Sequence, residues 1–267
     1  MYMINISRIL VGEDVFDTYL QSSGDLLAMV DITFDAFLEN THVQNFVIRY
    51  DQELPLYRAA ALKIYNDVNN YNQTQGFFSA IQCRIKSKNS LFFKMYSDLK
   101  ENYSGEAKIP DVSIQSAYDD IKDVVGLRAA CQYLSDIKST SNKVFKNFLV
   151  KEQGYRYPHE NLSKDPSQFQ EKDYTNRHEE ETGYRGFHLY LEIPTEIDIF
   201  GKSRRWPICE IQIRTELQHI WASRSHDLVY KPQEEVLPRN REDMKQIGHQ
   251  IGAADYFLDR LKDDLMR

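Results

Sequence analysis

The segment "WPICEIQIR", residues 206–214, constrains the fold most because apolar and polar side chains alternate along it. Successive side chains of a β-strand point to opposite faces of a sheet, so Cys209, Ile211 and Ile213 share one face. The opposite face carries three polar side chains: Glu210, Gln212 and Arg214. Such a strand needs an apolar layer on one face and water, a partner or a ligand on the other. A helical pattern follows directly at 215–230.

Two more strands are predicted, at 124–134, where an apolar run is typical of a central strand, and at 186–193. Helices are expected from apolar periodicity and capping signals over 14–39, 54–71, 88–103, 113–121, 136–152, 215–230 and 239–265. Pro55 is expected in the first turn of its helix, and Asn89 or Ser90 is expected to cap the next. These elements predict an α+β fold, a small mixed sheet flanked by helices.

Composition excludes several classes of protein. The 267 residues are 42% hydrophobic, which allows a sizeable core, yet no apolar run is long enough to span a membrane. The N-terminus lacks the pattern of a signal peptide, and the isolated cysteines Cys83, Cys131 and Cys209 indicate reduced thiols. We therefore expect a cytoplasmic protein. A basic stretch at 81–108 within a chain of net charge −7 suits a phosphate-bearing ligand better than duplex DNA.

A candidate metal site combines Glu210 with Asp123, which stands at the entrance of the strand 124–134. Two carboxylates facing each other from neighbouring strands suit Mg²⁺, which binds one or two carboxylates together with substrate phosphates. An aspartate that merely ends a helix or forms a turn is the alternative interpretation of Asp123. Arg128 lies further along the same strand.

The segment "RIKSKNSLFFK", residues 84–94, is a candidate phosphate-binding segment. Arg84 and Lys86 precede a predicted helix, and Ser90 and Lys94 share one face of its first turns. Basic side chains that converge near a helix N-terminus can cradle a polyphosphate. Many surface helices also begin with basic residues, so the segment alone does not decide between the two interpretations.

The segment "GYRGFH", residues 183–188, is a candidate base-binding loop. Tyr184 precedes a predicted strand, where its ring could stack on a nucleotide base. Arg185 and His188 would then lie within reach of the ribose or its phosphates. A tyrosine packed in the core is the alternative interpretation.

Taken in order, four segments resemble the motifs of the RelA/SpoT synthetase domain: "RIKSKNSLFFK", "DVVGLR", "TGYRGFH" and "EIQIRTELQHIWASRSH". The similarity covers about residues 80–231. It implies a nucleotidyltransferase-like fold and transfer of the β,γ-pyrophosphate of ATP to a ribose 3′-hydroxyl, usually of GDP or GTP, to make (p)ppGpp. It also implies a helical N-terminal extension (1–75), a synthetase domain (76–231) and a C-terminal helix (232–267).

The resemblance also implies residue roles. ATP would be held by Arg84, Lys86, Ser90, Lys94 and Arg128. Asp123 and Glu210 would bind Mg²⁺, and Glu210 would also accept the proton of the 3′-hydroxyl. Tyr184 would stack on the acceptor base. The acceptor and its phosphates would be positioned by Arg185, His188, Gln212 and Arg214.

Two departures from the family pattern lie on the acceptor side, whereas the ATP side is intact. The residues before Gly-Tyr are an acidic run, 179–181, and Thr182, where the family commonly has a basic residue and Asn. Ser225 precedes His226 where the family often has Glu. The acceptor therefore stays open between GDP or GTP, an adenosine nucleotide and the 3′ end of tRNA. The last two are typical of toxins, some with an antitoxin partner, and a catalytically dead nucleotide-binding protein is a further alternative.

Overall fold

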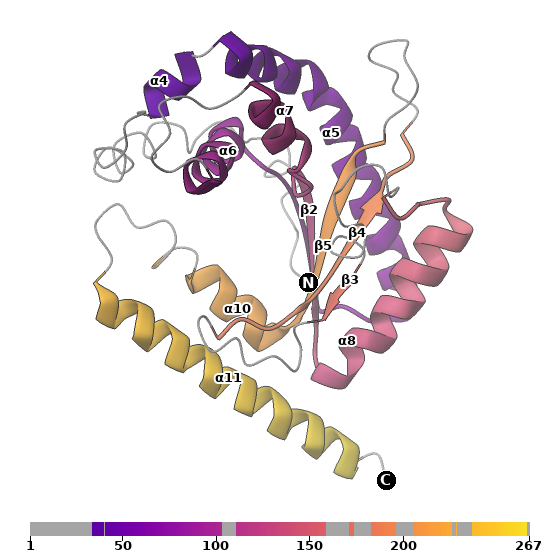
Figure 1. The fold of residues 1–267 in the computed structure, drawn as a ribbon. Helices are drawn as coiled ribbons and strands as arrows, with labels where there is room; N and C mark the ends of the chain where they lie inside the picture. The colour runs from indigo at the N-terminus through magenta and orange to yellow at the C-terminus, as the bar shows by residue number, and fades with distance from the viewer. Residues whose placement is uncertain are drawn as a thin grey trace.

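A five-stranded mixed sheet lies at the centre of the computed structural model, which describes residues 34–39, 41–102, 111–158, 171–173, 183–195, 206–225, 228 and 237–265 (Figure 1). The strands are β1 (Ala80–Ile85), β2 (Val125–Cys131), β3 (Glu171–Asp173), β4 (Phe187–Glu192) and β5 (Ile208–Thr215). Their order is β1-β2-β5-β4-β3, with β2 parallel to β5 and every other neighbouring pair antiparallel. The predicted α+β fold is confirmed.

Helices surround this sheet: α4 (Phe34–Glu39), α5 (Thr41–Gln75), α6 (Lys88–Asn102), α7 (Asp111–Asp119), α8 (Leu134–Thr140), the π-helix η1 (Ser141–Glu152), α10 (Glu216–Ser225) and α11 (Pro238–Leu265). The helix predicted at 136–152 is thus divided into α8 and η1. Most of the helix predicted at 14–39 lies outside the described residues. In the part of the chain described here, none of these helices has the length and apolar character needed to cross a membrane.

The start predicted for the second helix, near Pro55, is wrong, because α5 begins at Thr41 and contains Pro55 in its interior. Proline removes one helical hydrogen bond and favours helix starts, which is why the sequence pattern indicated a boundary there. Tertiary packing overrides this preference. Phe46 is buried before the proline and Ile64 after it, so both halves of α5 have apolar partners.

Strand β1 was not predicted from the sequence, where Arg84 was expected only to precede a helix. Ile81 is buried and pairs with Ala129 of β2, and Arg84 pairs with Gly126. Alternation of apolar and polar residues over 81–85 is the signal that could have revealed this strand. A Cβ atom on Gly126 would lie 3.3 Å from Arg84 Nε, so the glycine makes room for the arginine across β2.

Two apolar clusters hold the elements together. The first joins α5 and η1 to the apolar face of the sheet, where Cys209, Ile211 and Ile213 are fully buried as their alternation predicted. The second joins the first half of α5 to α4, α6 and α7, with Phe92 and Met95 at its centre. Because α5 contributes to both clusters, it connects the sheet to α6, whose first turns belong to the candidate phosphate-binding segment, residues 84–94. The predicted division at residue 75 stays a prediction.

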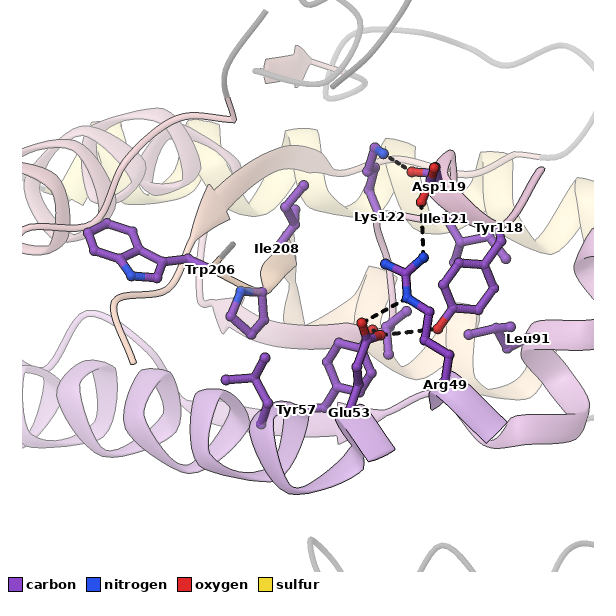
Figure 2. Close-up of a pocket in the computed structure, with 13 residues that line it drawn as sticks. Arg49, Glu53, Tyr57, Leu91, Tyr118, Asp119, Ile121, Lys122, Trp206 and Ile208 are labelled. Carbon is purple, nitrogen blue, oxygen red and sulfur yellow. Dashed lines mark hydrogen bonds and ion pairs between the residues drawn. The ribbon is translucent and has the colours of Figure 1, made fainter. Parts of the chain in front are cut away.

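A pocket between α5, α7 and the start of β5 is lined by a network around Glu53 (Figure 2). Arg49 Nε lies 2.9 Å from Glu53 Oε1, and Glu53 Oε2 accepts hydrogen bonds from the Tyr57 and Tyr118 hydroxyls at 2.6 and 3.2 Å. Arg49 also lies 3.7 Å from Asp119. The polar groups of this pocket therefore bind one another and connect α5 to α7.

We expect Glu53→Ala to lower the free energy of unfolding by about 3 kcal/mol, because two tyrosine hydroxyls and a guanidinium lose their shared acceptor. Urea denaturation measures the loss. The matched control is Asp51→Ala on the same helix, which removes only a surface ion pair with Lys88 and should cost below about 1 kcal/mol. Equal losses in the two variants would contradict a structural role for the Glu53 network.

Candidate functional site

The polar face of the sheet carries most of the predicted site residues. The register places Glu210 of β5 between Gly126 of β2 and Tyr190 of β4. One step further along, Gln212 lies between Arg128 and His188. Because alternate residues face the same side, these side chains gather over the three central strands.

Glu210 is a buried carboxylate with three donors. Its Oε1 accepts a hydrogen bond from the Tyr190 hydroxyl at 2.9 Å and lies 3.3 Å from His188 Nδ1. Its Oε2 accepts from Gln212 Nε2 at 2.9 Å. Burial raises the pKa of Glu210, but the contacts with His188 and Tyr190 outweigh it and lower that pKa to about 2. Glu210 is therefore an anion throughout the physiological pH range.

Asp123 lies just before β2 and is surrounded by cations. Lys86 Nζ is 2.5 Å from its Oδ2, Lys94 Nζ is 3.5 Å from its Oδ1, and Arg84 Nη2 is 3.9 Å from its Oδ2. Burial raises the pKa of Asp123, Lys94 and Lys86 lower it, and the net shift is downward. Asp123 stands three residues before Gly126, the residue of β2 that pairs with Glu210, so the two carboxylates lie near the same edge of the sheet, and the negative charge of Glu210 acts on Asp123.

Backbone hydrogen bonds hold the candidate phosphate-binding segment, residues 84–94, in place beside Asp123. The Tyr50 hydroxyl of α5 donates to the Lys86 carbonyl at 2.6 Å, and the Lys86 amide donates to the Val124 carbonyl at 2.7 Å. The cap of α6 is Ser87, whose Oγ accepts from the Ser90 amide at 3.3 Å. The predicted caps, Asn89 and Ser90, are therefore wrong, because both residues already lie inside the helix.

On the acceptor side, five side chains form a closed ring of hydrogen bonds. Glu210 contacts His188, the second ring nitrogen of His188 contacts the Tyr184 hydroxyl, and Arg214 Nε donates to that hydroxyl at 2.9 Å. Arg214 also donates to Gln212, which donates back to Glu210. The Arg214 guanidinium lies over the Tyr184 ring, 4.9 Å from its centroid. The ring links the candidate base-binding tyrosine to the candidate catalytic carboxylate.

Arg185 is not brought together with the other predicted acceptor residues. Its side chain is buried, and its guanidinium occupies the space that a Cβ atom on Gly252 of α11 would fill. Its backbone N–H donates to Gln218 Oε1 at 3.3 Å. A direct contact between Arg185 and an acceptor stays a prediction.

Sequence reasoning missed two residues of this face. Tyr190 follows His188 by two positions, so strand alternation alone could have placed it beside Glu210. His219 of α10 lies near Arg214 and Arg128; burial and these positive charges lower its pKa. No sequence pattern pointed to His219. The acidic run 179–181 and His226 lie outside the described residues.

The two carboxylates fit a magnesium ion better than a metal that needs a full protein cage. Asp123 Oδ1 is buried and accepts no hydrogen bond within the described part of the chain. The residues that the structure describes contain no group of three or more His, Cys, Asp or Glu side chains arranged to hold a metal. Mg²⁺ commonly takes one or two carboxylates and completes its shell with phosphates and water.

The family model named "Region found in RelA / SpoT proteins" matches residues 83–235, which is more than half of the chain. The chain therefore belongs to the RelA/SpoT family, as its four motifs indicated. All the residues gathered around Asp123 and Glu210 lie within the matched region.

Individual proteins agree with this assignment. The chain is 28% identical over 158 residues to the GTP pyrophosphokinase YjbM of Bacillus subtilis, a match that covers 53% of this chain and 64% of the relative, slightly under two thirds. Two solved structures share the fold, both of small alarmone synthetase 1 from B. subtilis. The form bound to its product pppGpp has a TM-score of 0.61 at 20% identity, covering 82% of this chain and 99% of that one. The form bound to AMPCPP has a TM-score of 0.57 at 18% identity, covering 82% and 98%.

We expect Tyr190→Phe to raise the pKa of Glu210 from about 2 toward its ordinary value of 4.5, because a donor to the ionised form is lost. A carboxylate with a lowered pKa stabilises the fold above its unfolded pKa and loses that contribution as the pH falls through its folded pKa. The wild-type advantage in unfolding free energy should therefore be largest above pH 4.5 and shrink towards pH 2.

Chemical denaturation at pH 7 and pH 3 measures this difference. The matched control is Tyr190→Phe in a Glu210→Gln background, where the loss should not depend on pH because no carboxylate remains. A loss of equal size at both pH values in the otherwise wild-type chain would contradict the assigned hydrogen bond.

Proposed function

We propose that the chain is an ATP-dependent pyrophosphokinase that transfers the β,γ-pyrophosphate of ATP to the ribose 3′-hydroxyl of GDP or GTP, giving (p)ppGpp. One observation carries the proposal: Asp123, with Arg84, Lys86 and Lys94 around it, lies within electrostatic reach of Glu210. A polyphosphate needs such cations, and transfer needs an acceptor aligned beside them. The family membership and the relatives named GTP pyrophosphokinase and small alarmone synthetase support it.

In the proposed reaction the 3′-oxygen of the acceptor forms a bond to the β-phosphorus of ATP. The bond between that phosphorus and the oxygen bridging to the α-phosphate breaks, and AMP leaves with the electron pair. Arg84, Lys86, Ser90, Lys94 and Arg128 would bind and orient the triphosphate. Asp123 and Glu210 would hold Mg²⁺, which when bound neutralises phosphate charge. Alignment and charge neutralisation are the main demands of phosphoryl-type transfer.

Glu210 has two proposed tasks that make different demands. A carboxylate with a pKa of about 2 is a good metal ligand, since no proton competes for it. The same low pKa makes it a weak base toward a hydroxyl. Proton acceptance becomes easier when His188 and Tyr190 turn their donors toward the acceptor instead, because the pKa of Glu210 then rises. The acceptor would thus activate the carboxylate by taking over its hydrogen bonds.

We expect Glu210→Gln to reduce transfer at least a hundredfold with every acceptor, because the amide is neither an anionic metal ligand nor a proton acceptor. The assay incubates the protein with γ-³²P-ATP and Mg²⁺, and separately with GDP, GTP, AMP, ATP or bulk tRNA as acceptor. Glu216→Gln, an exposed residue at the start of α10, is the control and should retain wild-type activity. Full activity of Glu210→Gln would remove Glu210 from the mechanism.

The same assay decides between acceptors. Label in GDP or GTP supports an alarmone synthetase. Label only in tRNA, or only in an adenosine nucleotide, supports the toxin alternative. That alternative is motivated by two departures from the family pattern, the acidic run 179–181 and the buried Ser225. No label in any acceptor with the wild-type protein would overturn the proposed transfer and favour a nucleotide-binding role. An antitoxin partner and a cytoplasmic location remain predictions.

A pair of Tyr184 variants tests base stacking separately from hydrogen bonding. Tyr184→Ala removes the ring, and since stacking on an aromatic side chain contributes about 1–3 kcal/mol per base, we expect the acceptor KM to rise roughly tenfold or more. Tyr184→Phe keeps the ring but loses the hydrogen bonds of the hydroxyl with His188 and Arg214, so its acceptor KM should rise less than about threefold. If Tyr184→Phe is as impaired as Tyr184→Ala, the hydroxyl network matters and stacking does not.

A further inference from the structure

Helix α11 packs against the rest of the molecule through small and polar residues, although an apolar stripe marks its sequence. Gly248, Gly252 and Asp255 are its buried residues, and their spacing places them on one face. Phe257 and Leu261 of the apolar stripe are 54% and 53% exposed. Figure 1 shows α11 running beside α10. The contact face of α11 is therefore built for close backbone approach.

The first close approach is to Gly183, at the start of the loop that carries Tyr184. A Cβ atom on Gly248 would lie 2.9 Å from the Gly183 carbonyl oxygen, and one on Gly183 would lie 2.8 Å from the Lys245 carbonyl oxygen. Gly183 has a φ of +74°, a conformation that L side chains rarely adopt. The loop backbone thus rests directly on α11. The Trp221 indole, which donates to the Met244 carbonyl at 2.9 Å, closes this contact.

The second close approach is to Arg185. Its guanidinium lies over Gly252, one helical turn from Gly248, where any larger residue would displace it. Asp255, only 2% exposed, lies on the same face of α11 and accepts a hydrogen bond from Thr215 Oγ1 at 2.7 Å. The negative charge of Asp255 acts on Arg185 and favours its charged form against burial. The charge of Asp255 thus offsets part of the cost of burying Arg185. Its hydrogen bond with Thr215 joins the end of β5 to α11.

These contacts with α11 hold the candidate base-binding loop, residues 183–188, in place. Arg185 is the immediate neighbour of Tyr184 and precedes His188 by three residues, and both of those side chains belong to the hydrogen-bonded ring around Glu210. A buried guanidinium costs more to keep in place once a nearby carboxylate is neutralised, and it lowers that cost by moving toward water. Movement of Arg185 would carry Tyr184 away from His188 and Arg214.

We propose that Arg185 and Asp255 are positioning residues: the guanidinium seated on Gly252 and the buried carboxylate three residues further along α11 together hold the loop 183–188 in the geometry that binds the acceptor. The inference rests on the proposed function and deepens it, since it assigns Arg185 a place behind the site instead of a contact with acceptor phosphates. It also gives the C-terminal helix a role in acceptor affinity and none in ATP binding.

The test measures KM for GTP and for ATP, together with amide hydrogen exchange over 183–188, in the full-length protein. Asp255→Asn should raise the KM for GTP about tenfold, leave the KM for ATP within twofold, and speed exchange of the loop while β2 and β5 stay protected. Gly252→Ala, which keeps both charges but displaces the guanidinium, should do the same. The matched control is Asp263→Asn, at an exposed position of α11, which should change nothing.

A double variant separates a pair from two independent structural residues. Arg185→Ala with Asp255→Ala removes both charges, so its KM for GTP should be no worse than that of either single variant. Losses that multiply in the double variant, or equal rises in both KM values, would overturn the proposal. So would unchanged loop exchange in both Asp255→Asn and Gly252→Ala.

The exchange measurement also keeps this inference distinct from the proposed function. If the wild-type protein has no transferase activity but Asp255→Asn speeds loop exchange, the proposed reaction is wrong and the positioning role of Arg185 and Asp255 stands. If the wild-type protein is active but Asp255→Asn changes neither loop exchange nor the KM for GTP, the proposed reaction stands and the positioning role is wrong.

Discussion

The parallel pairing of β2 with β5 is the constraint on which the candidate site depends. In a parallel pair both strands start at the same edge, so Asp123 just before β2 and Glu210 near the start of β5 come within electrostatic reach of each other. The antiparallel neighbours then add Arg84 from β1 on one side and His188 from β4 on the other. Together these elements bring to one face the two carboxylates proposed to hold a metal ion, the arginine proposed to bind phosphate and the imidazole proposed to face the acceptor.

Much of this could be predicted from sequence, because strand alternation is a local property. The alternation in 206–214 correctly separated the buried face of Cys209 and Ile211 from the polar face of Glu210. It could not show which strand lies beside β5, since pairing depends on distant contacts. The four motifs indicated the family, which the family match confirmed, but the β2–β5 pairing is seen only in the fold. The residue roles themselves stay proposals.

The errors arose where tertiary contacts override local preference. Pro55 signalled a helix start, yet apolar contacts on both sides of it hold α5 continuous. An apolar stripe runs along α11, yet its contact face is formed by glycines that admit Gly183 and Arg185. Arg185 seemed to point at the acceptor because it stands between Tyr184 and His188. Only the packing of α11, far away in the sequence, shows that its guanidinium lies on Gly252; a contact between Arg185 and an acceptor stays a prediction.

The closed ring of hydrogen bonds around Glu210 has a thermodynamic consequence. Tyr184, His188, Gln212 and Arg214 form hydrogen bonds with one another, so each hydrogen bond that an acceptor would form with them, if it binds as proposed, replaces an existing one. Such an exchange contributes little net enthalpy. Discrimination among acceptors must then come from ring stacking, shape and charge at the edge of the site. Two acceptors with the same ribose and phosphates would differ in affinity mainly through their bases.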